Sequence, residues 1–167
     1  MAYSDRFPRF QSLESMAGHR ATKGCRIMVF AIKAAIRDPR TQAFVFEAQK
    51  TMYGGKQVAA GDTIYLFASE NEGGHGLVAR GIVTSSEGVT KKRGVARQTP
   101  RVSITVKRTA SANKPLGRTE LKPFTEWKDG RPETELNFKF YRQATDKVVS
   151  ISDEAAKFLD AFVSVRL

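Results

Sequence analysis

Short apolar runs rich in β-branched and aromatic residues, separated by turns with Gly and Pro, dominate the chain. Cys25–Ala34 ("CRIMVFAIKA") is apolar almost throughout, as expected of a buried strand. Arg101–Arg108 instead alternates Val102, Ile104 and Val106 with polar residues, the period-two pattern of a half-buried strand. The pattern predicts strands at Cys25–Ala34, Ala43–Lys50, Asp62–Ser69, Gly76–Ser85, Arg101–Arg108 and Glu135–Gln143.

The last segment of the chain has the features of a long helix. Ser152 is suited to the N-cap, and the carboxylates that follow it suit the positive end of the helix dipole. The apolar face of this predicted helix consists of Ala155, Leu159, Phe162 and Val163. Short strands with few helices predict an α+β fold, a small closed or half-closed twisted β-barrel of about six strands with short flanking helices and this C-terminal helix.

The length of 167 residues fits one domain with a substantial core. Residues 1–24 lack sustained periodicity and contain Pro8, so we expect an N-terminal arm that packs loosely or lies along a partner. The predicted domain spans residues 25–167.

Charge points to a polyanionic partner. The formal net charge is +11, and an excess of this size favours nucleic acid through counterion release and long-range steering. Much of it lies between Lys91 and Arg131, where twelve Lys or Arg residues face three acidic ones. Phe124 and Trp127 interrupt this basic segment, a mixture suited to phosphate contacts beside base stacking. A solvated surface is the plainer interpretation of any single charge run.

Several function classes find little support. The chain has one cysteine, Cys25, and two histidines, His19 and His75, too few for a typical zinc site. We therefore expect no metal and no cofactor, with Cys25 as a core residue. No apolar run approaches the roughly 20 residues of a membrane span, and the first residues do not resemble a signal peptide. These features predict a cytoplasmic protein without a membrane partner.

The glycine-rich loop Asn71–Gly76 ("NEGGHG") raises the question of a phosphate cradle. It lacks the Lys-Ser/Thr ending of a P-loop and the spacing of a dinucleotide fingerprint. No glycine-flanked serine elbow is present elsewhere. We therefore predict that the loop connects two strands, with His75 at most a contact at the rim of a site.

The order of motifs resembles the EVE domain, a family of the PUA-like superfamily related to the ASCH and YTH domains. The matching pieces are "MVFAIKA" ending near Lys33, "GDTIYLFAS" ending at Ser69, the glycine-bearing "GLVARGIV", and "FYRQATDKVVSIS" before the final helix. The resemblance covers about Cys25 to Val163. It implies a compact twisted barrel with a pocket for one extruded base, often a modified one such as methylated cytosine in DNA.

The resemblance also implies site residues. Lys33 matches the lysine that closes the family's first strand, Phe67 and Ser69 match its strand-end motif, and Arg142 with Gln143 match its Arg-Gln pair. The family's usual Trp in the first strand and the Ser-Glu-Pro after its lysine are absent. The aromatic wall of the pocket is therefore expected from Tyr53 or Trp127. Trp127 is equally interpretable as a lid over the core. The expected contacts to the nucleic-acid backbone are Lys91, Lys92, Arg93, Arg97, Arg118 and Lys122.

These inferences predict a non-catalytic module that takes a single modified base out of its stack, from DNA in preference to RNA. A cleft of single-base size beside Ser69 would support it, and a barrel centre filled with apolar side chains would argue against it. A separately encoded effector nuclease is a candidate partner. The alternative is an ASCH-like amidohydrolase or ribonuclease acting on a modified nucleoside or RNA, with Lys33, Glu47 and Thr63 as residues to check. A small-molecule sensor or partner-binding subunit is a third candidate.

Overall fold

The computed structural model describes residues 28–95, 97–142 and 145–165 of the chain. The expected N-terminal arm, Cys25, His19 and Gln143 lie outside the described residues. Within them, no helix is long and apolar enough to span a membrane.

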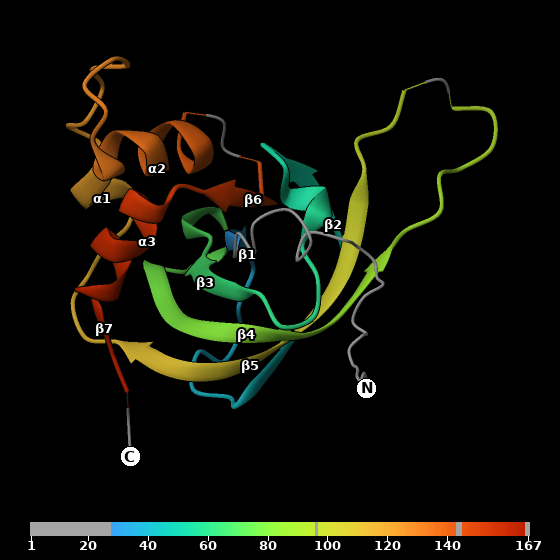
Figure 1. The fold of residues 1–167 in the computed structure, drawn as a ribbon, viewed down its shortest axis with the longest axis horizontal. Coiled ribbons are helices and arrows are strands. Elements are labelled where there is room, and N and C mark those ends of the chain that lie inside the picture. Colours follow the sequence, from blue (N-terminus) through green and yellow to red (C-terminus); the bar gives the residue numbers. More distant parts are fainter. Residues whose placement is uncertain (1–27, 96, 143–144, 166–167) are drawn as a thin grey trace, which may run out of the picture.

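Seven strands form one mixed sheet in the order β2-β6-β1-β3-β4-β5-β7 (Figure 1). An additional antiparallel pairing of β2 with β5 closes six of these strands into a ring. The strands are β1 (Val29–Ala34), β2 (Ala43–Met52), β3 (Thr63–Ala68), β4 (Gly76–Gly88), β5 (Arg101–Ala112), β6 (Lys147–Ile151) and β7 (Val163–Ser164).

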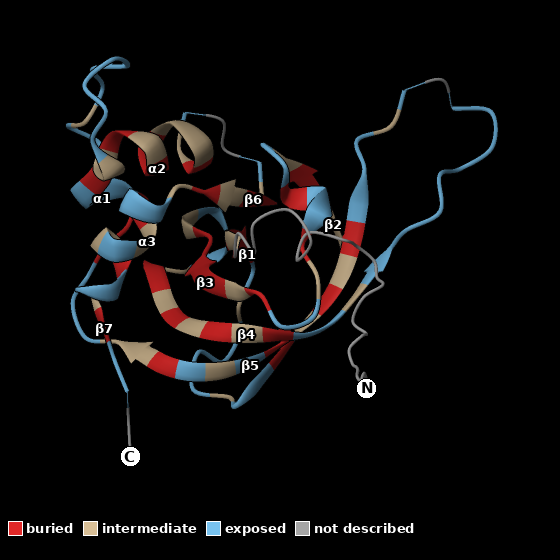
Figure 2. Cartoon of the chain, in the orientation of Figure 1, coloured by how far each residue is buried: buried red, intermediate tan, exposed pale blue. Residues whose placement is uncertain are grey.

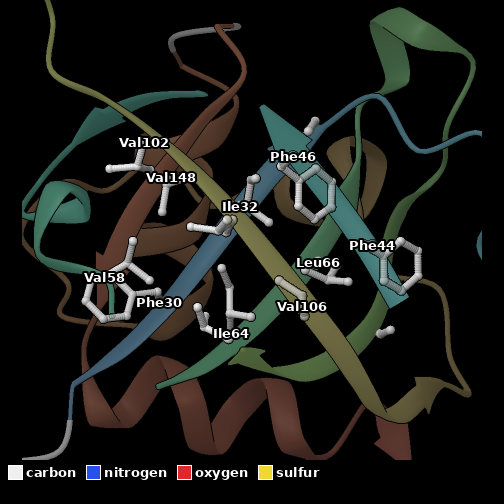
Figure 3. Close-up of a cluster of buried hydrophobic side chains, with 14 residues drawn as sticks. Phe30, Ile32, Phe44, Phe46, Val58, Ile64, Leu66, Val102, Val106 and Val148 are labelled. Carbon is white, nitrogen blue, oxygen red and sulfur yellow. The ribbon is translucent and has the colours of Figure 1, made fainter. Parts of the chain in front are cut away.

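The interior of the ring is a closed apolar core. Side chains from β1 to β6 meet there, including Phe30, Ile32, Phe44, Phe46 and Leu66 (Figure 3). Burying one such aliphatic or aromatic side chain completely stabilises the fold by about 1.5–3 kcal/mol relative to leaving it exposed. The centre of the ring is therefore filled with apolar side chains, the observation expected to argue against a base pocket inside the barrel, so a binding site must lie at the ends of the ring or on its outer face.

The alternating residues of the same strands form a second core on the outer face. Ala31 of β1, Tyr65 and Phe67 of β3, and Val149 of β6 pack there against the helices. Figure 2 shows the buried positions of β3 and β6 next to these helices. The helices are α1 (Arg118–Leu121), α2 (Pro132–Phe140) and α3 (Asp153–Asp160). Two short 3-10 turns lie between strands: η2 (Gly55–Gln57) between β2 and β3, and η3 (Glu70–Glu72) between β3 and β4.

One predicted strand is wrong. Glu135–Gln143 was expected to be a strand because Leu136, Phe138 and Phe140 alternate with polar residues, but its residues 135–140 belong to helix α2. Pro132 at the first helical position favours a helix start, and Leu136 and Phe140 are four residues apart, so they also share one helical face. Both are fully buried, whereas Phe138 lies off that face.

The other expectations compare well with the structure. Five predicted strands match β1 to β5, although residues 25–27 of the first are outside the described residues. Ser152 caps α3 by accepting a hydrogen bond from the backbone N–H of Ala155. The helix ends at Asp160, so two residues predicted on its apolar face lie beyond it: Phe162 in the turn that follows and Val163 on β7. Strands β6 and β7 were not predicted. The α+β class is confirmed, and the sheet has seven strands, not about six.

Candidate functional site

The carboxyl ends of the parallel neighbours β1 and β3 bring Lys33 and Ser69 together. Lys33 is the register partner of Phe67, and the backbone N–H of Ser69 donates to the carbonyl of Ala34 at 2.9 Å, extending the ladder one step beyond β3. Side chains two residues apart on a strand share a face, so Ser69 follows Phe67 toward the helices. Lys33 and Ser69 are both buried.

Within the described part of the chain, two oxygen atoms at this point are buried without a hydrogen-bond partner. They are Ser69 Oγ and Glu70 Oε1, in consecutive residues. The other carboxylate oxygen, Glu70 Oε2, accepts from the backbone N–H of Arg118 at 2.8 Å and from the Tyr141 hydroxyl at 3.2 Å. A buried polar atom left unsatisfied costs about 1–3 kcal/mol, so a ligand that supplies donors here would remove a standing penalty.

Two buried lysines face the same region. Lys33 and Lys147 are register partners on β1 and β6, and neither has any exposed surface. Lys33 Nζ donates to the carbonyl of Phe140 at 2.8 Å and lies 5.0 Å from the centre of the Tyr141 ring. Lys147 Nζ donates to the carbonyl of Thr145 at 3.0 Å.

The electrostatics of this cluster follow from its burial. Desolvation lowers the pKa of Lys33, opposed by the negative charges of Asp146 and Glu70. Desolvation, reinforced by the nearby charge of Lys33, lowers the pKa of Lys147 to about 8. Desolvation and the carboxylate of Glu70 raise the pKa of Tyr141, which holds it as a neutral hydrogen-bond donor.

We call Lys33, Ser69, Glu70, Tyr141 and Lys147 the polar cluster. It combines free acceptor capacity on Ser69 and Glu70 with ammonium donors on two lysines. Such a set matches a planar polar ligand that carries both donors and acceptors on one edge. Arg118 borders it and is held by a 2.9 Å hydrogen bond from its guanidinium to the Asn71 side chain.

A basic groove lies on the other side of the β3 end. It has a volume of about 630 Å³, and Ala68 and the glycine-rich loop form part of its wall. Its basic lining residues are Arg37, Arg40, His75 and Arg108. The loop connects β3 to β4, as predicted, and His75 lies in the groove and not in the polar cluster.

The structure separates the residues expected to form one base pocket. Phe67 is fully buried and packs on Phe140 with ring centres 5.0 Å apart, so it is a core residue beneath the polar cluster. Tyr53 and Trp127 line a different cleft, against α2. The Arg142 guanidinium is stacked on Phe138, 4.8 Å from the ring centre. Lys33 and Ser69 therefore remain together, while the two expected aromatic walls lie elsewhere.

The residues to check for an enzyme do not converge. Thr63 pairs with Val29, four residues before Lys33 on β1, which places it about 13 Å away along the strands. Glu47 is exposed on β2.

The basic segment is also divided. Lys91, Lys92, Arg93 and Arg97 lie on the loop between β4 and β5, which projects from the body at the right of Figure 1. Arg118 and Lys122 lie on and directly after α1, at the opposite side of the molecule (Figure 1). Across this loop, the side chain of Gln98 accepts a hydrogen bond from the N–H of Lys92 at 2.9 Å and donates one to the Lys92 carbonyl at 2.7 Å.

Sequence reasoning missed Glu70, Tyr141 and Lys147. Glu70 directly follows Ser69, and an acidic residue beside a matched serine was the available signal. Tyr141 was assigned to a strand that is in fact the end of α2. Lys147 opens a strand that went unpredicted, and its pairing with Lys33 spans most of the chain.

Comparison with solved structures identifies the fold. Human THYN1 protein, in a crystal structure with DNA containing 5-methylcytosine, aligns with a TM-score of 0.57 over 80% of this chain and 96% of that chain, at 11% identity. The DUF55 domain of human thymocyte nuclear protein 1 gives 0.54 over 79% and 96%, at 10% identity. This chain has the EVE/PUA-like fold.

A hypothetical protein from Leishmania major aligns with this chain at a TM-score of 0.52, over 81% of this chain and 94% of that chain, at 16% identity. No family model and no curated protein matches the sequence. The resemblance drawn from the motifs is thus confirmed for the fold. At these identities it extends to the arrangement of strands and helices, and not to individual binding residues.

Proposed function

We propose that this protein binds nucleic acid and takes a single base, a modified cytosine in DNA as the first candidate, into the polar cluster. The observation that carries the proposal is the pair of buried, unpartnered oxygens on Ser69 and Glu70 next to two buried lysines. The protein of the same fold that was solved with 5-methylcytosine DNA supports it.

The chemistry of a cytosine edge complements the cluster. Cytosine presents an amino group as donor, with a ring nitrogen and a carbonyl oxygen as acceptors, once it leaves the base pair. Glu70 Oε1 can accept from the amino group, and Ser69 Oγ can donate or accept. The ammonium groups of Lys33 and Lys147 suit the carbonyl oxygen. Taking a base out of its stack costs a few kcal/mol, which these new hydrogen bonds would offset.

Charge outside the cluster would hold the flanking backbone. The basic groove beside Ala68 and the β4–β5 loop carry positive side chains on different sides of the same domain. Phosphate contacts of this kind position a nucleic acid without reading its sequence. In this proposal, the surface charges supply affinity for nucleic acid, and the polar cluster selects the base.

The test is a binding measurement by fluorescence anisotropy with matched duplexes containing cytosine, 5-methylcytosine or 5-hydroxymethylcytosine, at two salt concentrations. We expect tighter binding to one modified duplex than to the plain one. Glu70→Gln, which keeps the shape but replaces an acceptor oxygen with a donor, should remove that preference. Equal and negligible affinity for all three duplexes at low salt would contradict the proposal.

A matched control comes from the same short turn. Glu72 is exposed two residues away, so Glu72→Gln makes the same change of charge without touching the cluster. It should leave the preference for the modified duplex intact. If both variants lose the preference equally, the cluster is not the site of selection.

A second candidate is an enzyme acting on a modified nucleoside or RNA at the same cluster. The observation that favours it is the lowered pKa of both buried lysines, a feature that recurs at catalytic sites. Incubation with modified nucleosides and labelled RNA, followed by chromatography, decides between the two. Turnover that Lys33→Ala abolishes would establish the enzyme, and no turnover with selective binding would establish the binding module.

A further inference from the structure

A second concave site lies against helix α2, in a place the polar cluster does not reach. It is a cleft of about 350 Å³ that we call the aromatic cleft, lined by Tyr53, Trp127, Gly130, Arg131, Thr134, Glu135, Phe138 and Lys139. Trp127 is 70% exposed and Tyr53 47%, which makes them the most exposed aromatic side chains in the described part of the chain. Single exposed apolar side chains are common, but exposed aromatic side chains that gather at one cleft are a feature of interaction sites.

Tyr53 is held in place by a strained backbone. Its φ is 51°, in the left-handed region that non-glycine residues rarely adopt, at a cost of about 1–3 kcal/mol. The N–H and Oγ of Ser150 both donate to the Tyr53 carbonyl and fix this conformation. Lys139 Nζ lies 5.4 Å from the centre of the Tyr53 ring. Strain that the surroundings maintain in this way is typical of binding sites.

Trp127 is oriented by α2. It meets Phe138 edge-on, with ring centres 5.2 Å apart and an angle of 77° between the ring planes. An edge-to-face contact of this kind orients an aromatic ring, and the exposure of Trp127 shows that most of its indole surface stays open. The cleft is thus partly preformed: the backbone of Tyr53 is held by Ser150, the ring of Trp127 contacts Phe138, and both aromatic side chains keep exposed surface.

Charge selects among the ligands that stack on aromatic rings. The charged residues that line the cleft are Arg131, Lys139 and one carboxylate, Glu135. Glu135 is already engaged: it pairs with Lys139 at 3.1 Å and accepts from the N–H and Oγ of Ser152 at 2.9 and 2.5 Å. The lining residues thus carry two cations and one engaged carboxylate, although Arg131 also pairs at 3.5 Å with Glu133, which does not line the cleft. A base with its phosphate would meet stacking surfaces and cations together, and therefore fits this lining better than a methylated ammonium group.

We infer that the aromatic cleft is a second nucleotide site, which stacks one unpaired base of a single-stranded segment on Trp127 and Tyr53 and takes its phosphate beside Arg131. The inference deepens the proposed function and rests on it for the choice of nucleic acid. Helix α2 links the two sites, because its Phe138 and Lys139 line the cleft and its Phe140 carbonyl holds Lys33. The site is expected to tolerate any base, since every base offers a stacking face.

Trp127 is the sole tryptophan of the chain, so its emission reports on the cleft directly. Titration of the full chain with short single strands of deoxythymidine should quench this emission, and inorganic polyphosphate, which has the charge without rings, should not. Trp127→Leu should weaken single-strand affinity, measured by anisotropy, at least about fivefold, while Trp127→Phe retains most of it. Because Trp127 is mostly exposed, both variants should keep the melting temperature of the parent protein.

The two sites can be told apart by crossing variants with readouts. Glu70→Gln should leave Trp127 quenching unchanged, and Trp127→Leu should leave the ratio of affinities for modified and plain duplexes unchanged. Single-strand binding without quenching, or with full affinity in Trp127→Leu, would overturn the inference. Quenching by a trimethyl-lysine peptide but not by single strands would also overturn it, in favour of a peptide site.

Discussion

Lys33 and Lys147 face each other on adjacent antiparallel strands, and both are completely buried. Burial disfavours the protonated form of both lysines; the charge of Lys33 adds to this effect at Lys147, whereas Asp146 and Glu70 oppose it at Lys33. Burying these two ammonium groups therefore has a cost, and it falls at the point where two oxygens of the described residues also lack hydrogen-bond partners.

The first prediction concerns stability against pH. The pKa of Lys147 is lowered to about 8 in the folded protein, from an ordinary value of 10.5, so the unfolded chain binds more protons between these values. The free energy of unfolding should therefore rise from about pH 8 to about pH 9.5, by up to about 1.4 kcal/mol per pH unit for this one proton, before tyrosines of the unfolded chain ionise. Urea denaturation at a series of pH values measures it.

Two variants test whether Lys147 causes this rise in the free energy of unfolding. Lys147→Met should flatten the rise, and Lys157→Met, which changes an exposed lysine on α3, should not. A slope that survives unchanged in Lys147→Met would show that Lys147 is not its source.

The second prediction is a gain of stability at the proposed site. Ser69→Ala removes a buried hydroxyl that has no partner, so the free energy of unfolding should stay level or increase by about 1 kcal/mol. Ser86→Ala is the counterpart, because Ser86 Oγ donates to the Val58 carbonyl at 2.9 Å and its loss should destabilise by about 0.5–1.5 kcal/mol. Equal losses in both variants, by thermal or urea unfolding, would show that the Ser69 hydroxyl is satisfied in solution.

The third prediction concerns the β4–β5 loop. If Lys91 and Lys92 contact phosphates, replacing both with Gln should reduce the slope of log affinity against log salt by about 2 for duplex DNA. The double variant of Lys56 and Lys157 removes the same charge from other exposed positions and should leave the slope nearly unchanged. Equal slopes in the two double variants would exclude the loop from the interface.

The fourth prediction separates backbone strain from steric clash at two glycines of the loop between β3 and β4. Gly73 and Gly76 have φ of 88° and 89°, but a Cβ on Gly73 would meet nothing within 4 Å, whereas one on Gly76 would lie 2.2 Å from the Leu116 carbonyl oxygen. Gly73→Ala should cost about 1 kcal/mol from backbone strain alone, and Gly76→Ala should cost more than about 3 kcal/mol. Similar losses in chemical denaturation would show that the loop relaxes around Gly76.

Local patterns predicted the fold where they were unambiguous. Val102, Ile104 and Val106 line the ring interior, as period-two alternation requires. The same alternation at Leu136 and Phe140 was misleading, because residues four apart also share a helical face. Pro132 was the local signal that favoured the helix.

The site was less predictable because its members are distant in sequence. Lys33 and Ser69 were selected by family motifs, and the parallel pairing of β1 with β3 brings them together. Nothing near Glu70 in the sequence indicates that Tyr141 and the Arg118 backbone hold one of its oxygens. Tyr53 and Trp127 were chosen as aromatic residues near the site, and tertiary packing gathers them into a different cleft.

The placement of β6 between β1 and β2 governs the order in which the chain can assemble. β6 begins at Lys147, near the end of the sequence, yet it supplies the strand that joins the first two. Until it arrives, the edges of β1 and β2 that it will cover remain open templates for another chain. During synthesis the ring therefore stays unsealed until β6 has emerged, more than a hundred residues after β1, and the apolar strands made before it depend on β6 for protection from aggregation.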